Sequence, residues 1–567
     1  MAYTVDEVAQ SRGVLRLSLC VDVAGSGPVD LTATYPDLYP YVRPEVSAPH
    51  LQLSHHQNPF VKTLCLIGRS SRNWGTQDKL AWLLTKKLPV ALSAGGTEPG
   101  PGPDRDALDE ERQAEPFSDY YTKAPSAMVL IDGSWSLPVN QTCGNLLIAV
   151  GGALPPADDG QPHTLGAVLE VQGHDGSAIA AADERLRRRF PLPVSARWSR
   201  LDAPVSVDDP KAIWEAAEAA DKYPSALRTA NAEIRAVVFP EEVAWRNSAD
   251  GWLFVVRQPG MTSAPPQSKK GKGKGRGRQR QQSTPTRYWA VRAGRAGPQD
   301  LAARVPELSG LSEHTVLIVG VGALGSSVAD QLARAGVGQL RLVDRDVLEP
   351  GNLVRHGGSF GQSGMPKAIA VANLVHDRSP YVEAEVTVIN LGGIRPPHSD
   401  ALNDADTLDS LVAGADLLVD ATAELGLQHL LADTAADAGI GYVAVSATNG
   451  GWGGMVTCIR SDSEGCYTCL SYWLSDRTIA LPPESPTTYV QPPGCADPTF
   501  TGSGFDLDQV AMQAVRTIVG ELACGERPYP PAPHDVAVLA LRKPDGTPIL
   551  PTWSGYSLNR HPSCLAH

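Results

Sequence analysis

The segment 315–346, TVLIVGVGALGSSVADQLARAGVGQLRLVDRD, is the feature that most restricts how this chain can fold. An apolar strand pattern leads into a glycine-rich turn and a helical pattern, and a second strand pattern then ends in acids. Gly320, Gly322 and Gly325 form G-x-G-x-x-G at the turn. Glycines there let the backbone approach a phosphate, and the N-terminus of the following helix supplies amide donors. We therefore predict an α/β fold with a Rossmann-like nucleotide site.

The residues that follow this segment favour one nucleotide chemistry over another. Dehydrogenases share the glycine motif, so the motif alone does not identify the reaction. The stretch 344–368 adds two acids, an amide and two cations: Asp344, Asp346, Asn352, Arg355 and Lys367. Such a cluster suits nucleotidyl transfer, in which negative charge develops around the α-phosphate and the leaving pyrophosphate. A hydride-transfer site has no need of it.

This pattern resembles the ThiF-type family, which includes ubiquitin-activating enzymes and the adenylyltransferases of thiamin and molybdopterin synthesis. The resemblance covers roughly residues 300–567. It implies that the domain binds ATP and magnesium, adenylates the C-terminal glycine of a ubiquitin-like protein, and forms a homodimer. It also implies the following contacts: Asp344 with the ribose, Asn352, Arg355 and Lys367 with the phosphates, and Asp346 beside them.

Two positions depart from the family pattern. The family usually has Gln after the Arg, and this chain has His356. The second acid of a D-x-T-D pattern is missing, because VDATAE places Asp420 first and Ala423 at the acid's position. That acid helps to hold magnesium in the family. We therefore assign Asp420 to the cofactor site, with Asp420 or Glu424 as the substitute ligand.

Two short motifs predict a structural zinc site. Cys466 and Cys469 form C-x-x-C, and Cys564 and His567 form C-x-x-H. Three thiolates and one imidazole make a closed tetrahedral ligand set. ThiF-type proteins often carry two cysteine pairs placed in this way. His561 is an alternative fourth ligand, and the alternative to zinc is a site that has lost its metal and keeps reduced thiols.

A further cysteine lies in the stretch 492–520. Cys495 sits in a Pro/Gly-rich loop before an amphipathic helical pattern, a position that favours reactivity over packing. In activating enzymes the corresponding loop carries the cysteine that takes the acyl group from AMP as a thioester. A structural loop cysteine is the alternative. Cys458 and Cys524 are predicted to be core residues of a strand and a helix.

The N-terminal stretch 31–67 contains YPDLYPYVRPEV and HHQNPFVKTLCLI. It resembles ubiquitin-conjugating enzymes, which have a Tyr/Pro-rich motif, a His-Pro-Asn motif, and a catalytic cysteine before Leu. His55 precedes Cys65 by the family spacing of ten residues (65 − 55). The resemblance implies that Cys65 accepts the acyl group and that an amide stabilises the oxyanion. That amide is either Gln57, which lies at the position of the family's Asn, or Asn58, which lies one residue later, and we favour Asn58. The alternative interpretation of Cys65 is a small hydrophobe packed in a strand.

Composition shifts along the chain predict its domains. Residues 1–92 form an α+β conjugating-like domain, 93–124 a flexible linker, 125–300 a mixed α/β middle domain, and 301–567 the adenylation domain. A basic, disordered loop is predicted at 261–286, because the run contains seven Lys/Arg and no acid. Its flanks have strand patterns, so this loop is expected inside a hairpin.

Composition also restricts location and partners. The net charge of −13 argues against a nucleic-acid-binding role. The longest uncharged apolar stretch is shorter than the roughly 20 residues of a membrane helix, and we find no signal-peptide pattern. Nine cysteines without an export signal indicate reduced thiols. We therefore expect a cytoplasmic protein without a membrane partner.

Together these motifs predict a fused activating and conjugating enzyme. ATP adenylates a C-terminal glycine, Cys495 takes it as a thioester, Cys65 receives it, and an amine of a protein or small molecule attacks. The arrangement looks most like the fused enzyme of CBASS antiphage operons, whose acceptor is the C-terminus of a cyclic-nucleotide synthase. Two alternatives are a sulfur-carrier adenylyltransferase, which leaves residues 1–92 unexplained, and a non-catalytic nucleotide-binding scaffold, suggested by Ala423.

Overall fold

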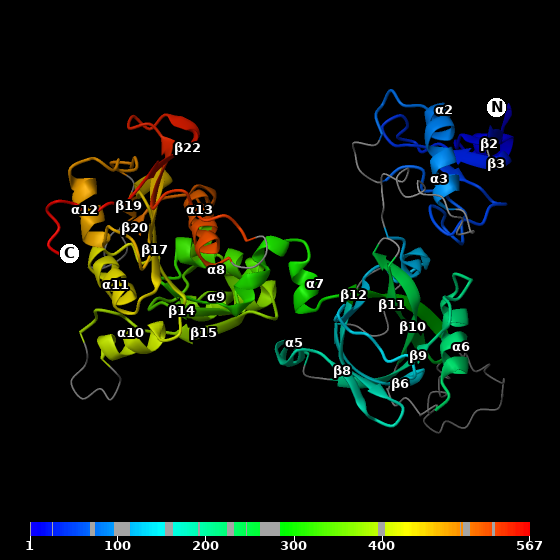
Figure 1. Cartoon of the computed structure of the whole chain (residues 1–567), viewed down its shortest axis with the longest axis horizontal. Coiled ribbons are helices and arrows are strands. Elements are labelled where there is room, and N and C mark those ends of the chain that lie inside the picture. The colour runs from blue at the N-terminus through cyan, green and yellow to red at the C-terminus, as the bar shows by residue number, and fades with distance from the viewer. Residues whose placement is uncertain are drawn as a thin grey trace, which may run out of the picture. The chain divides into compact units, whose positions relative to one another are not determined.

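The computed structural model divides the chain into two compact units, Met1–Gly297 and Pro298–His567 (Figure 1). It describes residues 2–24, 26–68, 74–95, 114–152, 163–190, 193–223, 232–244, 247–260, 284–394, 403–487, 489–490, 499–523 and 528–566. The second unit begins three residues (301 − 298) before the predicted start of the adenylation domain. The finer division of the first unit near residues 92 and 125 stays a prediction.

The second unit is built on an eight-stranded sheet in the order β15-β14-β13-β16-β17-β18-β21-β22. The strands are β13 (Thr315–Val319), β14 (Gln339–Val343), β15 (Glu383–Thr387), β16 (Leu417–Asp420), β17 (Gly441–Ala447), β18 (Gly453–Ile459), β21 (Val536–Arg542) and β22 (Pro548–Tyr556). The strands from β15 to β17 are parallel, and the remaining pairings are antiparallel. Strand order reverses between β13 and β16, the point at which parallel α/β sheets bind ligands. The predicted Rossmann-like architecture is confirmed.

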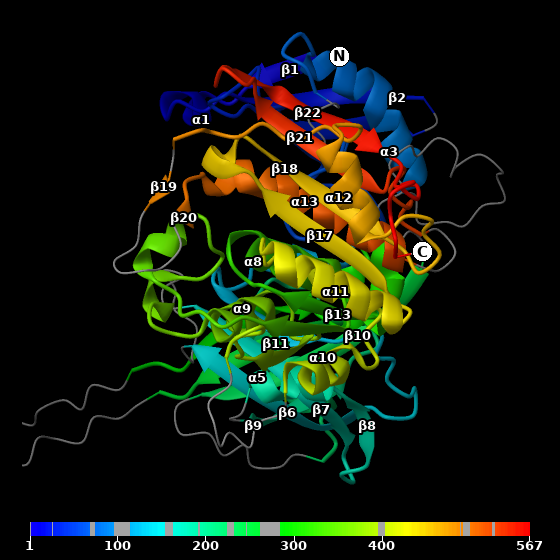
Figure 2. The ribbon, with the colours of Figure 1, turned by 90° about the vertical axis from the view of Figure 1, so that its left-hand side faces the viewer.

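Helices cover both faces of this sheet. The α-helices are α7 (Pro298–Ala302), α8 (Ala323–Ala335), α9 (Lys367–Arg378), α10 (Asp404–Val412), α11 (Leu425–Asp437), α12 (Tyr467–Ser475) and α13 (Gly504–Leu522), and the 3-10 turns are η3 (Pro306–Glu313), η4 (Pro350–Val354), η5 (Phe360–Gln362) and η6 (Asn449–Gly451). One apolar core joins the sheet to α8, α9 and α13, and a second joins it to α10, α11 and α12 (Figures 1 and 2). Within the described part of the chain, no helix combines the length and apolar character that a membrane span requires.

The chain begins with a four-stranded antiparallel sheet in the order β1-β2-β3-β4. These strands are β1 (Ala2–Val5), β2 (Arg16–Val23), β3 (Gly27–Thr34) and β4 (Glu45–Ser47), and α1 (Glu7–Ser11) follows β1. A helical segment comprises α2 (Leu80–Trp82), the π-helical η1 (Leu83–Lys87) and α3 (Leu88–Ala94). Alternate residues of β2 are buried, and the leucines of the helical segment recur at helical spacing, so the two apolar faces form one core. This is the predicted α+β fold.

The rest of the first unit is a sheet in the order β5-β12-β11-β10-β9-β6-β7-β8. Its strands are β5 (Ala127–Ile131), β6 (Cys143–Gly152), β7 (Thr164–Gly173), β8 (Ala178–Ala181), β9 (Pro193–Arg200), β10 (Glu233–Ala244), β11 (Asn247–Gln258) and β12 (Arg287–Arg295), with η2 (Phe117–Tyr120), α5 (Glu184–Arg189) and α6 (Pro210–Ala220). Because β7 also pairs with β5, the strands close into a barrel around an apolar core. The antiparallel pairing of β11 with β12 confirms the predicted hairpin, and residues 261–283 of its basic loop lie outside the described residues.

Candidate functional site

The three glycines after β13 have different structural roles. Gly320 adopts φ +86°, and a Cβ there would lie 2.8 Å from the carbonyl carbon of Ala421, across the reversal of strand order. A Cβ on Gly325 would lie 1.9 Å from the carbonyl oxygen of Gly320. A Cβ on Gly322 would meet no atom within 4 Å. Gly320 and Gly325 therefore allow the turn to form, whereas Gly322 keeps its open side accessible to a ligand.

A pocket opens at the carboxyl ends of β13, β14 and β16. Predicted site residues in its lining are Gly320, Gly322, Asp344, Asp346 and Lys367. Thr422 and Glu424 line it from the segment after β16. The pocket thus combines open backbone, two cations (Arg345 and Lys367) and several carboxylates, which is a suitable set for a nucleotide with its metal.

Asp344, Asp346 and Lys367 are held together by direct bonds. The Asp344 carboxylate accepts the backbone N–H of Val321 at 2.8 Å and that of Asp346 at 2.7 Å. Lys367 Nζ lies 2.7 Å from the Asp346 carboxylate, and the lysine side chain is 13% exposed. The lysine cation is therefore oriented at the pocket before any phosphate arrives, which limits the reorganisation that binding requires.

Asn352 and Arg355 lie on and after η4, outside the lining of this pocket. The Asn352 side-chain oxygen accepts the backbone N–H of Glu349 at 3.0 Å, and the Arg355 N–H donates to the Asn352 carbonyl at 3.0 Å. Burial lowers the pKa of the Arg355 guanidinium. Their predicted contacts with the phosphates stay predictions.

His356, which replaces the usual Gln, fastens the glycine turn. Its Nδ1 accepts the N–H of Gly358 at 2.9 Å, so its Nε2 carries the proton and donates to the Val321 carbonyl at 2.9 Å. The ring is buried, and this burial lowers the pKa of His356. A glutamine amide can supply the same donor, which accounts for the exchange of one residue for the other.

Asp420 lies behind the pocket. Its carboxylate is fully buried and accepts the N–H and hydroxyl of Thr422 at 2.9 and 2.8 Å. Its second oxygen accepts the Tyr442 hydroxyl at 2.9 Å, and burial raises the pKa of Asp420. Ala423 adopts φ +56° between this group and Glu424. Of the two acids predicted to replace the missing ligand, Glu424 is the one that lines the pocket.

The three predicted cysteine ligands come together at one point. The Cys466 sulfur lies 3.8 Å from that of Cys469 and 3.7 Å from that of Cys564. A tetrahedron with zinc–sulfur bonds of about 2.3 Å has sulfur atoms about 3.8 Å apart, so this spacing fits zinc. Both ring nitrogens of the alternative ligand His561 are engaged elsewhere, because Nδ1 accepts the Ser563 N–H and Nε2 faces Asp476 at 3.3 Å, so the geometry does not favour it. The predicted fourth ligand, His567, lies outside the described residues.

Cys65 lies in a short segment of the N-terminal fold that pairs in antiparallel fashion with the segment containing His56 and Gln57. Its N–H donates to the His56 carbonyl at 2.8 Å, and the next pair inward is Gln57 with Leu64. Leu64 and Leu66 are buried, whereas Cys65 is exposed. The alternative that Cys65 packs as a small hydrophobe is therefore wrong, and its thiol is accessible.

The two candidate oxyanion amides have different environments. Gln57 is buried, and its amide accepts the Leu53 N–H at 2.9 Å and donates to the Ala48 carbonyl at 3.0 Å. Asn58 uses only its side-chain oxygen, which accepts two backbone N–H groups of the following turn at 2.9 and 3.1 Å. Its NH₂ group has no hydrogen-bond partner among the described residues. The geometry thus favours Asn58 over Gln57 as a donor.

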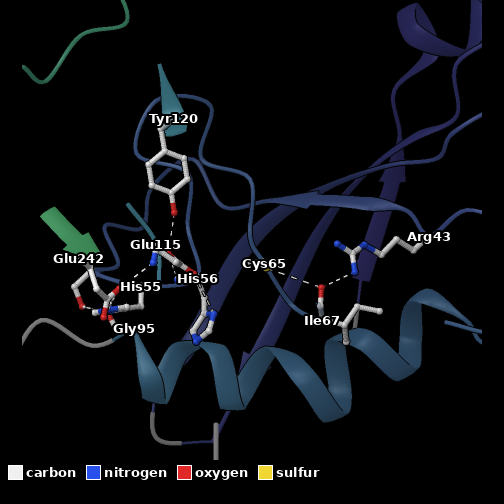
Figure 3. Close-up of polar contacts among 10 residues, drawn as sticks. Arg43, His55, His56, Cys65, Ile67, Gly95, Glu115, Tyr120 and Glu242 are labelled. Carbon is white, nitrogen blue, oxygen red and sulfur yellow. Dashed lines mark hydrogen bonds and ion pairs between the residues drawn. The ribbon is translucent and has the colours of Figure 1, made fainter. Parts of the chain in front are cut away.

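Three polar residues that the motifs did not indicate gather at His55 and His56, the second of which pairs with Cys65. Glu115 accepts the His56 N–H at 2.9 Å and the Tyr120 hydroxyl at 2.8 Å (Figure 3). Glu242, from β10, lies 3.2 Å from His55 Nε2. They come from segments distant in sequence, so no local pattern could have indicated them.

Of the three other cysteines that the sequence motifs singled out, one lies in the core and two lie outside the described residues. Cys458 is buried in β18, which confirms its predicted core position. Cys495 follows β19 (Tyr489–Val490) and precedes β20 (Thr499–Phe500), and it lies outside the described residues, as does Cys524.

Comparisons with known proteins assign both ends of the chain to families. Residues 299–526 match the ThiF family, and residues 6–129 match the Prokaryotic E2 family B. The adenylyltransferase and sulfurtransferase UBA4 of Yarrowia lipolytica is 31% identical over 40% of this chain and 52% of its own length. The crystal structure of E. coli MccB with ATP covers 47% of this chain and 71% of its own, with 17% identity and a TM-score of 0.33.

Two uncharacterized proteins of Sinorhizobium fredii align along nearly the whole chain. One, y4qC, is 28% identical over 99% of this chain and 93% of its own length. The other, y4oA, is 32% identical over 98% of this chain and 92% of its own length. The chain therefore belongs to the family of y4oA, and it joins a Prokaryotic E2 family B domain to a C-terminal ThiF family domain.

Proposed function

We propose that this protein activates the C-terminal glycine of a ubiquitin-like protein or nucleotidyltransferase with ATP. The acyl group passes to Cys495, then to Cys65, and finally to an amine of a protein or small molecule. The observation that carries this proposal is the exposed thiol of Cys65 in an E2-type domain on the same chain as a ThiF domain. A role in bacterial antiphage defence and a homodimeric state are part of the proposal and rest on the sequence resemblance.

The pocket at the reversal of strand order supports the adenylation step. The open side of Gly322 admits a phosphate, and Lys367 would neutralise charge that develops on it. Asp344 would bind the ribose, with Asn352 and Arg355 completing the phosphate contacts. Asp346 and Glu424 line the same pocket and are the carboxylates that would hold magnesium, which supplies charge neutralisation at the phosphates.

The thiol steps follow from ordinary acyl-transfer chemistry. A thiolate attacks the activated carbonyl and AMP leaves, which forms the first thioester. Exchange with a second thiolate conserves the thioester, and an amine then forms the more stable amide. Because both domains share one chain, tethering raises the effective concentration of one thiol at the other.

The experiment measures ATP–pyrophosphate exchange and acyl loading of the purified full chain with candidate partner proteins. Lys367→Ala and Arg355→Ala should lose exchange, since losing a preorganised contact costs about 2.7–4 kcal/mol. Lys211→Ala is the control, because this lysine is 60% exposed and its ion pair within the described part of the chain is with Glu215 on α6. Unchanged exchange in both site variants would refute the site assignment, and a non-catalytic scaffold would show no exchange at all.

The order of transfer is tested by mass spectrometry under non-reducing conditions. Cys65→Ala should trap an adduct on Cys495 without final product, and Cys495→Ala should block loading of Cys65 while exchange continues. Cys20→Ala, at another exposed thiol, should change neither step. Normal loading of Cys65 in Cys495→Ala would show that the conjugating thiol attacks the adenylate directly.

A further inference from the structure

The segment that follows the N-terminal fold places a carboxylate and a phenol at the Cys65 site. In a regular antiparallel pair, the His56 N–H would bond to the Cys65 carbonyl. Here the Cys65 N–H donates to His56, but the His56 N–H donates to both oxygens of Glu115 at 2.9 Å. His56 Nδ1 lies 3.4 Å from the same carboxylate. Glu115 is therefore fixed against the residue that pairs with Cys65.

Tyr120 extends this contact by one hydrogen bond. Its hydroxyl donates to Glu115 at 2.8 Å (Figure 3). Burial raises the pKa of Tyr120, and the charges of Glu115 and of an ionised Cys65 raise it further. The phenol is thus neutral and has its proton directed at a carboxylate.

Strand β10 holds this segment in place. The Glu115 N–H donates to Glu242 at 2.9 Å, and the Ser118 N–H donates to Glu241 at 2.8 Å. Phe60, from the loop before Cys65, packs on Phe117 at a centroid distance of 5.6 Å. The side chains of Glu115 and Glu242 are only 16% and 11% exposed. A cluster so enclosed is more than a solvated group of surface charges.

We propose that Tyr120 and Glu115 accept the proton of the amine that attacks the acyl group on Cys65. The proposal rests on the proposed function, in which Cys65 carries an acyl group as a thioester. The ammonium of the attacking lysine gives one proton to the Tyr120 oxygen as Tyr120 gives its own to Glu115, which releases it to solvent. The neutral amine then forms the C–N bond, the C–S bond breaks, and Cys65 leaves as a thiolate that takes up the second proton from the nitrogen. No oxidant or metal is needed.

Tyr120 and Glu115 should raise the rate of acyl transfer from Cys65 to the amine by as much as a positioned general base does. A lysine amine has an ordinary pKa of about 10.4 and is protonated at neutral pH, so its attack requires loss of a proton. General-base assistance of this kind typically contributes about 10²–10⁴-fold. Hydroxylamine is already unprotonated at neutral pH and attacks without such help. The two nucleophiles therefore distinguish proton acceptance from mere support of the fold.

The test needs neither ATP nor the natural partner. The full chain is acylated at Cys65 with the thiophenyl ester of N-acetylglycine, and discharge to free lysine or to hydroxylamine is followed by intact mass. Glu115→Gln and Tyr120→Phe are compared with Asp119→Asn. Asp119 lies on the same turn, its side chain is 77% exposed, and its one ion pair among the described residues is with Lys123 at 3.7 Å.

The two site variants should lose about 10²-fold in discharge to lysine, with hydroxylamine discharge within about threefold of wild type. Asp119→Asn should match wild type with both nucleophiles. Unchanged lysine discharge in both site variants, or an equal loss with both nucleophiles in both, overturns the proposal. A Cys65 that accepts no acyl group contradicts the proposed function itself, and a failed ATP exchange with normal lysine discharge contradicts only the adenylation step.

Discussion

Substituting two glycines of the same motif separates folding from ligand access. In Gly325→Ala the new Cβ would stand 1.9 Å from a backbone oxygen of Gly320, so α8 must move away from β13. Overpacking of this kind typically costs about 1–3 kcal/mol, and a backbone neighbour places this case at about 3 kcal/mol. In Gly322→Ala the Cβ meets nothing within 4 Å, and the cost is that of a poorer helix cap, about 0.5–1 kcal/mol.

These costs convert to melting temperatures for the second unit, which has 270 residues (567 − 298 + 1). At about 2–4 °C per kcal/mol, Gly325→Ala should lower the melting temperature by about 6–12 °C and Gly322→Ala by about 1–4 °C. Because Gly322 lines the pocket, its variant should instead bind ATP at least about tenfold more weakly, or about 1.4 kcal/mol.

Differential scanning calorimetry and equilibrium binding of ATP measure the two effects on the full chain. Equal destabilisation by the two substitutions would refute the assignment of the clash. Wild-type affinity for ATP in Gly322→Ala would refute the role of the open glycine.

Three further predictions concern the cysteine cluster, the glycine turn and the conjugating loop. Elemental analysis should find about one zinc per chain. The Cys466→Ser variant should lose both the zinc and stability, whereas the control Cys20→Ser should keep them. A wild-type protein that is equally stable without metal would contradict the site. Burial lowers the folded-state pKa of His356, so its contribution to stability is complete above the ordinary value of about 6.5 and is lost as pH falls below it. Unfolding free energy should therefore drop more steeply between about pH 6.5 and 5 in wild type than in His356→Gln, by up to about 1.4 kcal/mol per pH unit, and parallel curves would exclude this residue. Gln57→Ala should cost about 1–3 kcal/mol of stability, because it leaves buried backbone groups unpaired. Asn58→Ala should mainly slow acyl discharge from Cys65, by about 10²–10³-fold. The reverse pattern would show that Gln57 is the donor.

What the sequence predicted best was chemistry held within one supersecondary unit. The glycine turn, its strands and helix, and the acids after β14 follow one another along the chain, so their spacing determines their geometry. The three predicted cysteine ligands also met, although Cys469 and Cys564 are far apart in sequence, because a zinc ligand set can be recognised from its motifs.

What the sequence could not give was the direction of individual side chains. Asp420 ends a buried parallel strand, as a ligand would, but its carboxylate turns to Tyr442 on the neighbouring strand β17. The closure of the middle sheet into a barrel was equally hidden, because each strand pattern is compatible with an open sheet. Pairing of β7 with β5 depends on register and twist accumulated over the whole sheet.

Strand β10 illustrates how a distant element becomes part of the conjugating site. Successive side chains of a regular strand point to opposite faces, yet Glu241 and Glu242 both bind the segment 115–118. The pairing of β10 with β11 shifts register directly after Glu242, and such irregularities turn a strand and re-aim its side chains. The bulge therefore allows both Glu241 and Glu242 to bind the segment that carries Glu115. If Glu115 accepts the proton of the attacking amine, the barrel positions a reacting group, which gives the middle of the chain a part in acyl transfer.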